Sequence, residues 1–144
     1  MALFPSLDWF RQVRDVYNSD SSLHKGGGGA CHTTAAFRVG GNEYLIQFEG
    51  TKIGDIRAAT AAELKDVDFV IEMPFDLWKD MIKSVQEHGK AERRYTLNSI
   101  DLSQAEGIAH SPSDDQYRQD LFYRYNQNFQ DYFDASARVE TTFA

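Results

Sequence analysis

Three carboxylates near the middle of the chain could supply acid–base chemistry. Asp66, Asp68 and Glu72 stand at even-numbered positions of a segment with a strand pattern, so we expect them on one face of a sheet. If that face lined an apolar pocket, one carboxyl could act as a general acid or base, with Tyr95 or His110 as its partner. This chemistry would suit a small hydratase or isomerase. A solvated outer face of the sheet explains the same carboxylates without catalysis.

The single cysteine is followed directly by a histidine. A thiolate generated by a neighbouring imidazole is a strong nucleophile, so Cys31 and His32 have the residue types for covalent catalysis. Consecutive residues of a strand point to opposite faces, however, and this segment has a strand pattern. The two side chains are therefore not expected to meet.

The spacing of other residues does not favour metal or phosphate binding. The histidines have no metal-ligand spacing such as His-x-x-x-His: His24, His32, His88 and His110. The four glycines at 26–29 lack the Lys and Ser or Thr that follow a phosphate-binding loop. We interpret them as a linker between a helix and a sheet, with a mobile flap over a ligand mouth as the alternative. No metal and no cofactor are expected.

Charge and composition restrict the partners. The 144 residues carry a net charge of −7, which would repel phosphate backbones unless a basic patch compensated. The densest basic group, Lys90, Arg93 and Arg94, contains Glu92, so we expect no nucleic-acid partner. The two arginines could instead hold an anionic headgroup.

The location in the cell is predicted from what the sequence lacks. No apolar run reaches the roughly 18–20 residues of a membrane helix, so no stable membrane insertion is expected. The N-terminus has no signal-peptide pattern, and the single cysteine, Cys31, fits a reducing cytoplasm. We therefore expect a cytoplasmic protein with one domain, residues 1–144.

Hydrophobic periodicity predicts the elements of the first half of the chain. They are a helix, a three-stranded meander, a short polar connection and a fourth strand: residues 6–18, 31–39, 43–49, about 52–59, 61–65 and 66–72. Ser6 is the expected N-cap of the helix. A hairpin turn is expected at Gly40-Gly41-Asn42 and a bulge around Gly54. In the fourth strand, Val67, Phe69 and Ile71 are expected to share one face.

The second half of the chain is expected to be mainly helical. Pro74 opens a helix with an apolar stripe, and Gly89 ends it. Residues 94–102 could form a fifth strand or an extended edge segment. Ser111-Pro112 is a helix-start pattern for a long helix over about 113–137, whose apolar face would contain Tyr117, Leu121, Phe122, Tyr125, Phe129, Tyr132 and Phe133. Residues 139–144 are expected to fray.

Two segments resemble the sterol carrier protein type 2 (sterol-binding domain) family. They are the hairpin Phe37-Arg38-Val39-Gly40-Gly41-Asn42-Glu43-Tyr44-Leu45-Ile46-Gln47-Phe48, and Asp66-Val67-Asp68-Phe69-Val70-Ile71 followed by Pro74-Phe75-Asp76-Leu77-Trp78. The order of elements is similar to that family over about residues 7–89. Beyond Gly89 the family's glycine-bearing strand is not evident, and a long aromatic helix stands there instead. The resemblance implies a sheet with a lipid-sized tunnel beneath it and a carrier role without catalytic residues.

The leading hypothesis is an α+β protein that carries an apolar ligand. An N-terminal helix and a four- or five-stranded, curved, mainly antiparallel sheet covered by helices would enclose an acyl chain, a sterol or a similar molecule. The walls of this hydrophobic pocket are predicted to be Phe37, Tyr44, Ile46, Phe48, Trp78, Ile82, Phe122 and Phe129. Two alternatives stay open: the cofactor-free hydratase or isomerase, and a non-catalytic interaction module whose aromatic helix is buried in a homodimer or another partner.

Overall fold

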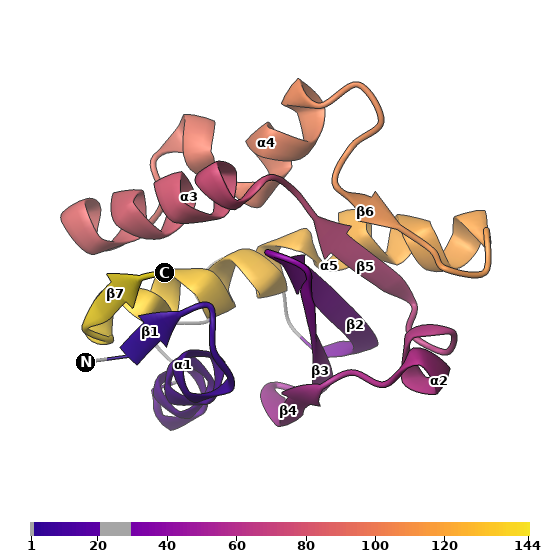
Figure 1. Ribbon diagram of the computed structural model, residues 1–144, viewed down its shortest axis with the longest axis horizontal. Coiled ribbons are helices and arrows are strands. Elements are labelled where there is room, and N and C mark those ends of the chain that lie inside the picture. Colours follow the sequence, from indigo (N-terminus) through magenta and orange to yellow (C-terminus); the bar gives the residue numbers. More distant parts are fainter. Residues whose placement is uncertain (1, 21–29) are drawn as a thin grey trace.

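The computed structural model describes residues 2–20 and 30–144, so His24 and the glycine run at 26–29 lie outside the described residues. The elements follow one another as Figure 1 shows: β1 (Ala2–Phe4), α1 (Leu7–Ser19), β2 (Cys31–Val39), β3 (Asn42–Gly50), β4 (Lys52–Ala58), α2 (Ala61–Leu64), β5 (Phe69–Glu72), α3 (Phe75–His88), η2 (Arg93–Tyr95), α4 (Leu97–Ser103), β6 (Ala109–His110), α5 (Gln116–Asp134), η3 (Ala135–Arg138) and β7 (Thr141–Phe143). Within these ranges no helix is both long and apolar enough to cross a membrane.

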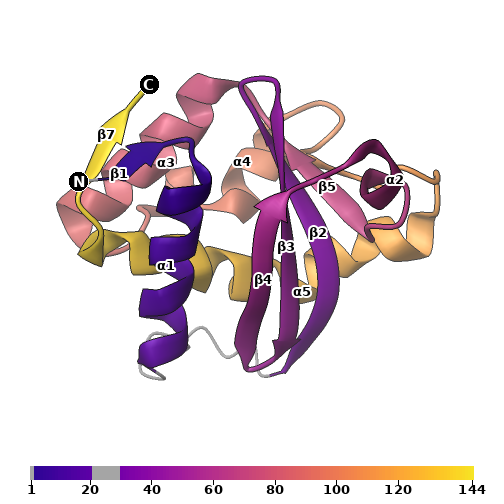
Figure 2. The same ribbon diagram turned by 60° about the horizontal axis from the view of Figure 1, so that its bottom comes forward.

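A five-stranded sheet forms the centre of the fold, in the order β4-β3-β2-β5-β6. β2 pairs antiparallel with β3, β3 with β4 and β5 with β6, whereas β5 runs parallel to β2. The predicted α+β fold with a mainly antiparallel sheet is therefore confirmed. α5 lies across one face of this sheet, and α1 packs beside β4 (Figure 2).

The meander forms where the alternation of apolar residues predicts it. Gly40 and Gly41 close the β2–β3 hairpin with φ values of 57° and 86°, a conformation that glycine adopts without a side-chain clash. The pairing register of β3 with β4 shifts opposite Gly54, which confirms the predicted bulge. Because of this shift, Ile53 and Ile56 both face the core although one position is odd and the other even.

The crossover from β4 to β5 explains one wrong expectation. α2 begins with a capping box, in which Thr60 Oγ1 accepts a hydrogen bond from Glu63 N and the Glu63 carboxylate accepts one from Thr60 N. Strand alternation starts only at Phe69, so Val67 does not share the face of Phe69 and Ile71. It joins a small apolar cluster on the other face of the sheet, with Ala36, Leu45 and Val70.

The two helices α1 and α3 form as predicted. Ser6 caps α1, and its Oγ accepts a hydrogen bond from Trp9 N at 3.1 Å. α3 ends at Gly89, whose φ of 80° is the left-handed conformation that closes many helices. Both helices turn their apolar stripes toward the core.

Residues 93–95 and 97–103 are helical, so the expectation of a strand over 94–102 was wrong. Thr96 caps α4, and its Oγ1 accepts a hydrogen bond from Ser99 N at 3.2 Å. The buried residues Leu97 and Ile100 are three positions apart, which is a helical spacing that an alternating strand would not bury. The fifth strand of the sheet is instead the two-residue β6.

α5 begins later than predicted. Asp115 is its N-cap and accepts a hydrogen bond from Arg118 N at 3.2 Å, so Ser111-Pro112 does not start the helix. Tyr117 was expected on the apolar face but is 72% exposed, because the first turn of α5 contributes no buried residue. The rest of the predicted face, from Leu121 to Phe133, is buried or packs against the core.

The two ends of the described chain pair with each other. β1 and β7 form a parallel two-stranded sheet in which Phe4 stands opposite Phe143. Trp9 Nε1 donates a hydrogen bond to Thr141 Oγ1 at 2.9 Å and ties α1 to β7. The expectation that residues 139–144 fray was wrong, because local composition does not show a strand partner at the opposite end of the chain.

Candidate functional site

The eight residues predicted to form the pocket walls all lie in one buried cluster. Their side chains are at most 7% exposed: Phe37, Tyr44, Ile46, Phe48, Trp78, Ile82, Phe122 and Phe129. They come from β2, β3, α3 and α5, and so lie between the sheet and the helices that cover it. The entry of a ligand among them stays a prediction.

Aromatic rings fill the space around Phe37. The centroid of its ring lies 5.9 Å from that of Trp78 and 6.1 Å from that of Phe129. Two rings outside the predicted set are closer still, Phe10 at 5.6 Å and Phe133 at 5.1 Å. Such separations are typical of favourable stacked and edge-to-face pairs. We call these five residues the aromatic core.

The sequence contained partial signals for the aromatic residues that the predicted walls omit. Phe10 and Phe133 have the helical spacing of their apolar faces, but nothing indicated that both rings touch Phe37. Trp9 stands one position off the stripe of α1, and Phe4 precedes the helix. Their placement depends on the β1–β7 pair, which brings Phe4 to 4.7 Å from Trp9 between ring centroids.

Two buried polar atoms of the described core have no hydrogen-bond partner, Trp78 Nε1 and Ser136 Oγ. Both residues are 0% exposed. The other tryptophan, Trp9, donates its Nε1 hydrogen to Thr141 Oγ1. An unpaired buried N–H costs about 1–3 kcal/mol. The indole N–H of Trp78 is therefore a donor that lacks an acceptor inside an otherwise apolar layer.

Cys31 and His32 point to opposite faces of β2, as the strand pattern predicts. The cysteine is buried and the histidine is exposed. Burial, together with the charge of Asp68, raises the pKa of the Cys31 thiol from 9.0 to about 12. A thiol that keeps its proton is a poor nucleophile, so this pair does not supply covalent catalysis.

Two of the three candidate carboxylates, Asp66 and Asp68, lie before the start of β5. Asp68 accepts hydrogen bonds from Thr33 Oγ1 at 2.7 Å and from Arg118 Nε at 3.1 Å. Asp66 is exposed, and its carbonyl oxygen accepts a hydrogen bond from the Arg118 guanidinium. These contacts hold α5 against the crossover, which is a structural role.

Glu72 and His110 are the two acid–base candidates that the structure brings together. Both line a surface hollow of about 620 Å³ beside the turn that follows α4. Glu72 is paired with Arg38, whose Nη1 lies 3.4 Å from the Glu72 carboxylate. Tyr95 lies elsewhere, in η2. Asp68, Glu72 and Tyr95 therefore do not form one catalytic group.

The residues considered for metal or anion binding do not form a common site in the described part of the chain. No group of three His, Cys, Asp or Glu side chains that could hold a metal occurs in the described ranges. His88 is paired with Glu92 at 3.0 Å on the surface. The arginines expected to act together separate: Arg94 stacks over the ring of Tyr95 at 4.7 Å, whereas Arg93 lines a cavity beside α5.

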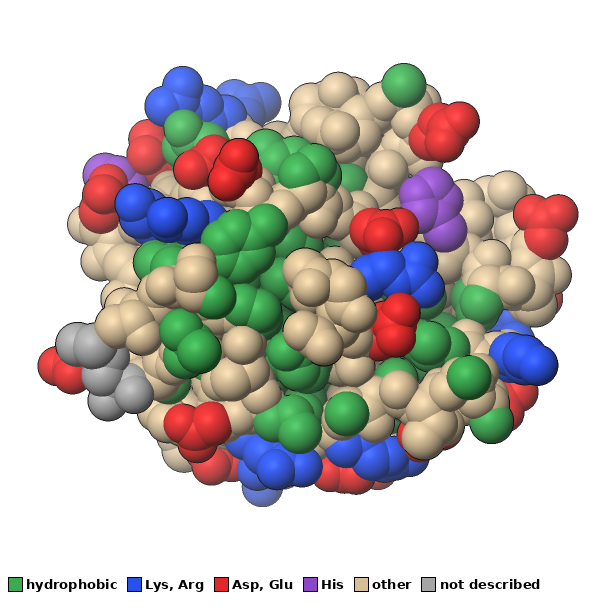
Figure 3. Space-filling view, in the orientation of Figure 1, with side chains coloured by type: hydrophobic (Ala, Val, Ile, Leu, Met, Phe, Trp, Pro, Cys, Tyr) green, Lys and Arg blue, Asp and Glu red, His purple; other side chains and the backbone are tan. Residues whose placement is uncertain are grey.

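One face of the molecule shows where the apolar interior approaches the surface. Apolar side chains gather near the middle of this face, between α1 and α3, and charged side chains of both signs surround them (Figure 3). Half-buried apolar residues of both helices, among them Leu7, Phe75 and Leu77, pack against the core.

No protein-family model and no curated protein matches the chain. Among solved structures, the chain is similar to the solution structure of a conserved hypothetical protein from Thermus thermophilus, described as "possibly sterol carrier protein". The TM-score is 0.57 over 95% of this chain and 90% of that chain, at 14% sequence identity. At this identity the likeness shows the fold alone, and it agrees with the sterol-carrier-like fold expected from the sequence.

Proposed function

We propose that the protein carries an apolar ligand, such as an acyl chain or a sterol, between its sheet and the helices α1, α3 and α5. The similar fold of a protein described as "possibly sterol carrier protein" supports this function. The predicted walls would then contact the ligand: Phe37, Tyr44, Ile46, Phe48, Trp78, Ile82, Phe122 and Phe129.

The unpaired indole N–H of Trp78 is the observation that carries the proposal. Trp78 is fully buried and packs against Phe37 and Phe133, whose rings offer no acceptor of ordinary strength. A hydroxyl, carboxyl or ester oxygen on the ligand would accept this hydrogen bond and remove a penalty of about 1–3 kcal/mol. The ligand class is therefore apolar with one oxygen-bearing end.

Binding would exchange contacts between rings for contacts between rings and ligand. Phe37 touches rings from α1, α3 and α5, so a ligand in this layer would have to move side chains and separate helices from the sheet. The exchange of one apolar contact for another costs little, because neither partner returns to water. The main cost is the rearrangement of closely packed side chains.

Thermal unfolding with a lipid panel tests the proposal. Oleic acid and cholesterol carry an oxygen, whereas squalene is a hydrocarbon of similar size. A ligand at one hundred times its Kd adds about 2.7 kcal/mol of stability, which should raise Tm by several degrees. If no member of the panel raises Tm and no lipid is retained by the freshly purified protein, the carrier function is refuted.

Two tryptophan variants locate the oxygen contact. Trp78→Phe should reduce the Tm gain from the oxygen-bearing lipids more than the gain from squalene. Trp9→Phe is the matched control, because the N–H of Trp9 already has an acceptor in Thr141. If both variants lost the same part of the Tm gain from the oxygen-bearing lipids, the assigned role of Trp78 would be contradicted.

A further inference from the structure

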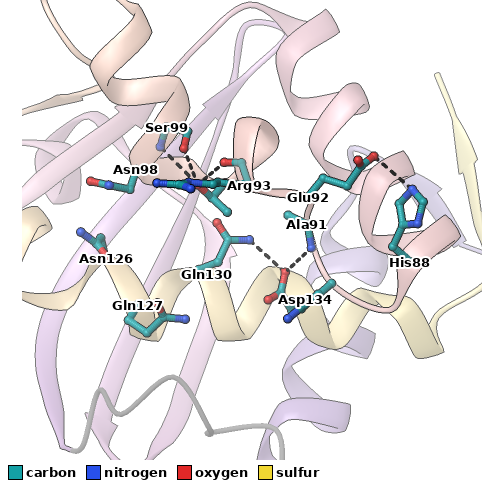
Figure 4. Close-up of a pocket in the computed structure, with 12 residues that line it drawn as sticks. His88, Ala91, Glu92, Arg93, Asn98, Ser99, Asn126, Gln127, Gln130 and Asp134 are labelled. Atoms are coloured by element: carbon teal, nitrogen blue, oxygen red, sulfur yellow. Dashed lines mark hydrogen bonds and ion pairs between the residues drawn. The ribbon is translucent and has the colours of Figure 1, made fainter.

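A cavity of about 680 Å³ lies on the side of α5 that does not face the aromatic core. It is bounded by the end of α3, by η2 and α4, and by α5 (Figure 4). Most of the side chains that line it carry a carboxamide, a hydroxyl or a charge, and no phenylalanine, tyrosine or tryptophan is among them. An apolar ligand would leave these groups unpaired, so the cavity suits a polar one.

Asp134 provides one end of the cavity. Its Oδ1 accepts hydrogen bonds from Ala91 N at 3.1 Å and from Gln130 Nε2 at 2.9 Å. Its Oδ2 has no partner in the described part of the chain, and the carboxylate forms no ion pair there. Burial raises the pKa of Asp134, and the charge of Lys90 is the smallest of the influences that oppose this shift. The Oδ2 atom of Asp134 is therefore an acceptor for a cationic group of a ligand.

Arg93 provides the other charged group. Its guanidinium takes part in no ion pair with the described part of the chain, and Arg93 lines the same cavity as Asn98 and Gln130 (Figure 4). A guanidinium binds carboxylates through two parallel hydrogen bonds. The neighbouring Asn98 amide adds a donor and an acceptor that no described residue uses.

The spacing along α5 sets the length of a matching ligand. Asn126, Gln130 and Asp134 repeat at intervals of four residues and so lie on one face of the helix. At 1.5 Å per residue, Asn126 and Asp134 are about 12 Å apart along the axis. A ligand that extends from the Asp134 carboxylate to the Arg93 guanidinium therefore needs several bonds between its own two charged groups.

We propose that this cavity binds a small zwitterion of dipeptide size, with its ammonium group at Asp134 and its carboxylate at Arg93. A peptide group between the two ends would hydrogen-bond with the side-chain amides of Asn98 and Asn126, which match it in donors and acceptors. The site is separate from the apolar layer, so the failure of either proposal leaves the other in place.

Titration of the full chain with glycylglycine, followed by amide NMR shifts, tests the proposal. We expect saturable shifts in residues 88–99 and 126–134, with a Kd of about 1 mM for so small a ligand. No saturable shifts in these segments up to about 20 mM would overturn the proposal.

Three variants assign the two ends of the ligand. Asp134→Asn keeps the Oδ1 acceptor for Ala91 and Gln130 but removes the charge, and it should weaken glycylglycine binding by about tenfold or more. Arg93→Gln should do the same. Arg94→Gln is the matched control, because the Arg94 guanidinium lies over the ring of Tyr95. This variant should bind glycylglycine with unchanged affinity.

A second probe separates the ammonium from the carboxylate. N-acetylglycine has a carboxylate but no ammonium, so it should bind more weakly than glycylglycine and depend on Arg93 but not on Asp134. Glycylglycine affinity that is unaffected by Asp134→Asn, or reduced equally by Arg94→Gln and Arg93→Gln, would contradict the assignment. The dispersion of the amide spectrum shows whether each variant is folded.

Discussion

The two sides of α5 have opposite surroundings. One side presents Phe122, Phe129 and Phe133 to the sheet and to α3, where rings fill the available space. The other side presents Gln130 and Asp134 to a cavity of about 680 Å³, where polar groups leave space open. Contacts between aromatic rings lower the free energy of the folded chain, so rings pack together. Carboxylates and amides can stay hydrogen-bonded to water until a ligand takes its place.

This contrast indicates different kinds of binding on the two sides. A ligand in the apolar layer has to separate side chains that already pack together, so its binding should change the structure. A ligand in the polar cavity enters space that already exists, so its binding should leave the backbone nearly unchanged. Stability measurements on matched variants test this difference between the two sides of α5.

The largest effect is expected from Phe129→Ala. The ring of Phe129 lies 4.7 Å from Phe48 and 5.4 Å from Phe69 between centroids, so its removal should cost about 3–5 kcal/mol in the free energy of unfolding. The neighbouring Gln130→Ala should cost about 1–3 kcal/mol, because Leu97 N loses its buried acceptor. Urea unfolding measures both. Equal costs would contradict the difference between the two sides of α5.

The two buried tryptophans give the next largest difference. Trp9→Phe removes a hydrogen bond to Thr141, whereas Trp78→Phe removes a donor that has no acceptor. We therefore expect Trp9→Phe to be more destabilising than Trp78→Phe by about 1–2 kcal/mol in urea unfolding. A larger cost for Trp78→Phe would show that its N–H is paired in solution.

Alkaline pH should weaken the apolar side. Burial raises the pKa of Cys31 from 9.0 to about 12 and that of Tyr17 from 10.0 to about 12. Each group keeps its proton longer in the folded chain, so the unfolded chain releases protons first as pH rises above 9 and unfolding becomes more favourable. For Cys31 the loss should be about 1–1.5 kcal/mol at pH 10, and Cys31→Ala should reduce it. A pH-independent stability between pH 8 and 10 would contradict this burial.

The smallest effect is expected at the start of α5, which belongs to neither side. Tyr117 is 72% exposed, so Tyr117→Ser should change the free energy of unfolding by less than about 0.5 kcal/mol. A cost near that of Phe129→Ala would mean that Tyr117 is buried in solution, as expected for an oligomer. Sedimentation of the unmodified protein would then identify the oligomer.

The apolar side could be predicted from the sequence because its signals are local. Alternation in 31–39 and 43–49 indicates an inward face of each strand without knowledge of the partner. The helical spacing of Trp78 and Ile82, and of Phe122 and Phe129, does the same for α3 and α5. The same signals cannot show whether the enclosed space is open or filled. That depends on Phe10 and Phe133, which reach Phe37 only through tertiary packing.

The polar side could not be predicted because its residues have no common pattern. Asn98 belongs to a segment that was expected to be extended, and Arg93 directly precedes it. Asp134 lies near the end of a helix that was predicted from its start pattern and its apolar face, and neither signal indicates what its polar face contacts. The backbone N–H of Ala91 and the side chain of Gln130 fix Asp134, and Ala91 is more than forty residues away from it in the sequence. Contacts between positions so far apart produce no periodic pattern in the amino-acid sequence.

Fluorescence quenching of Trp78 tests the carrier function most directly. In a Trp9→Phe variant, Trp78 is the only tryptophan, and it is fully buried in the aromatic core. A fatty acid with a spin label on its chain should quench this emission with a saturable curve, and unlabelled oleic acid should restore it. Absence of quenching, or quenching that does not saturate and is not reversed by oleic acid, would contradict ligand binding between the sheet and the helices.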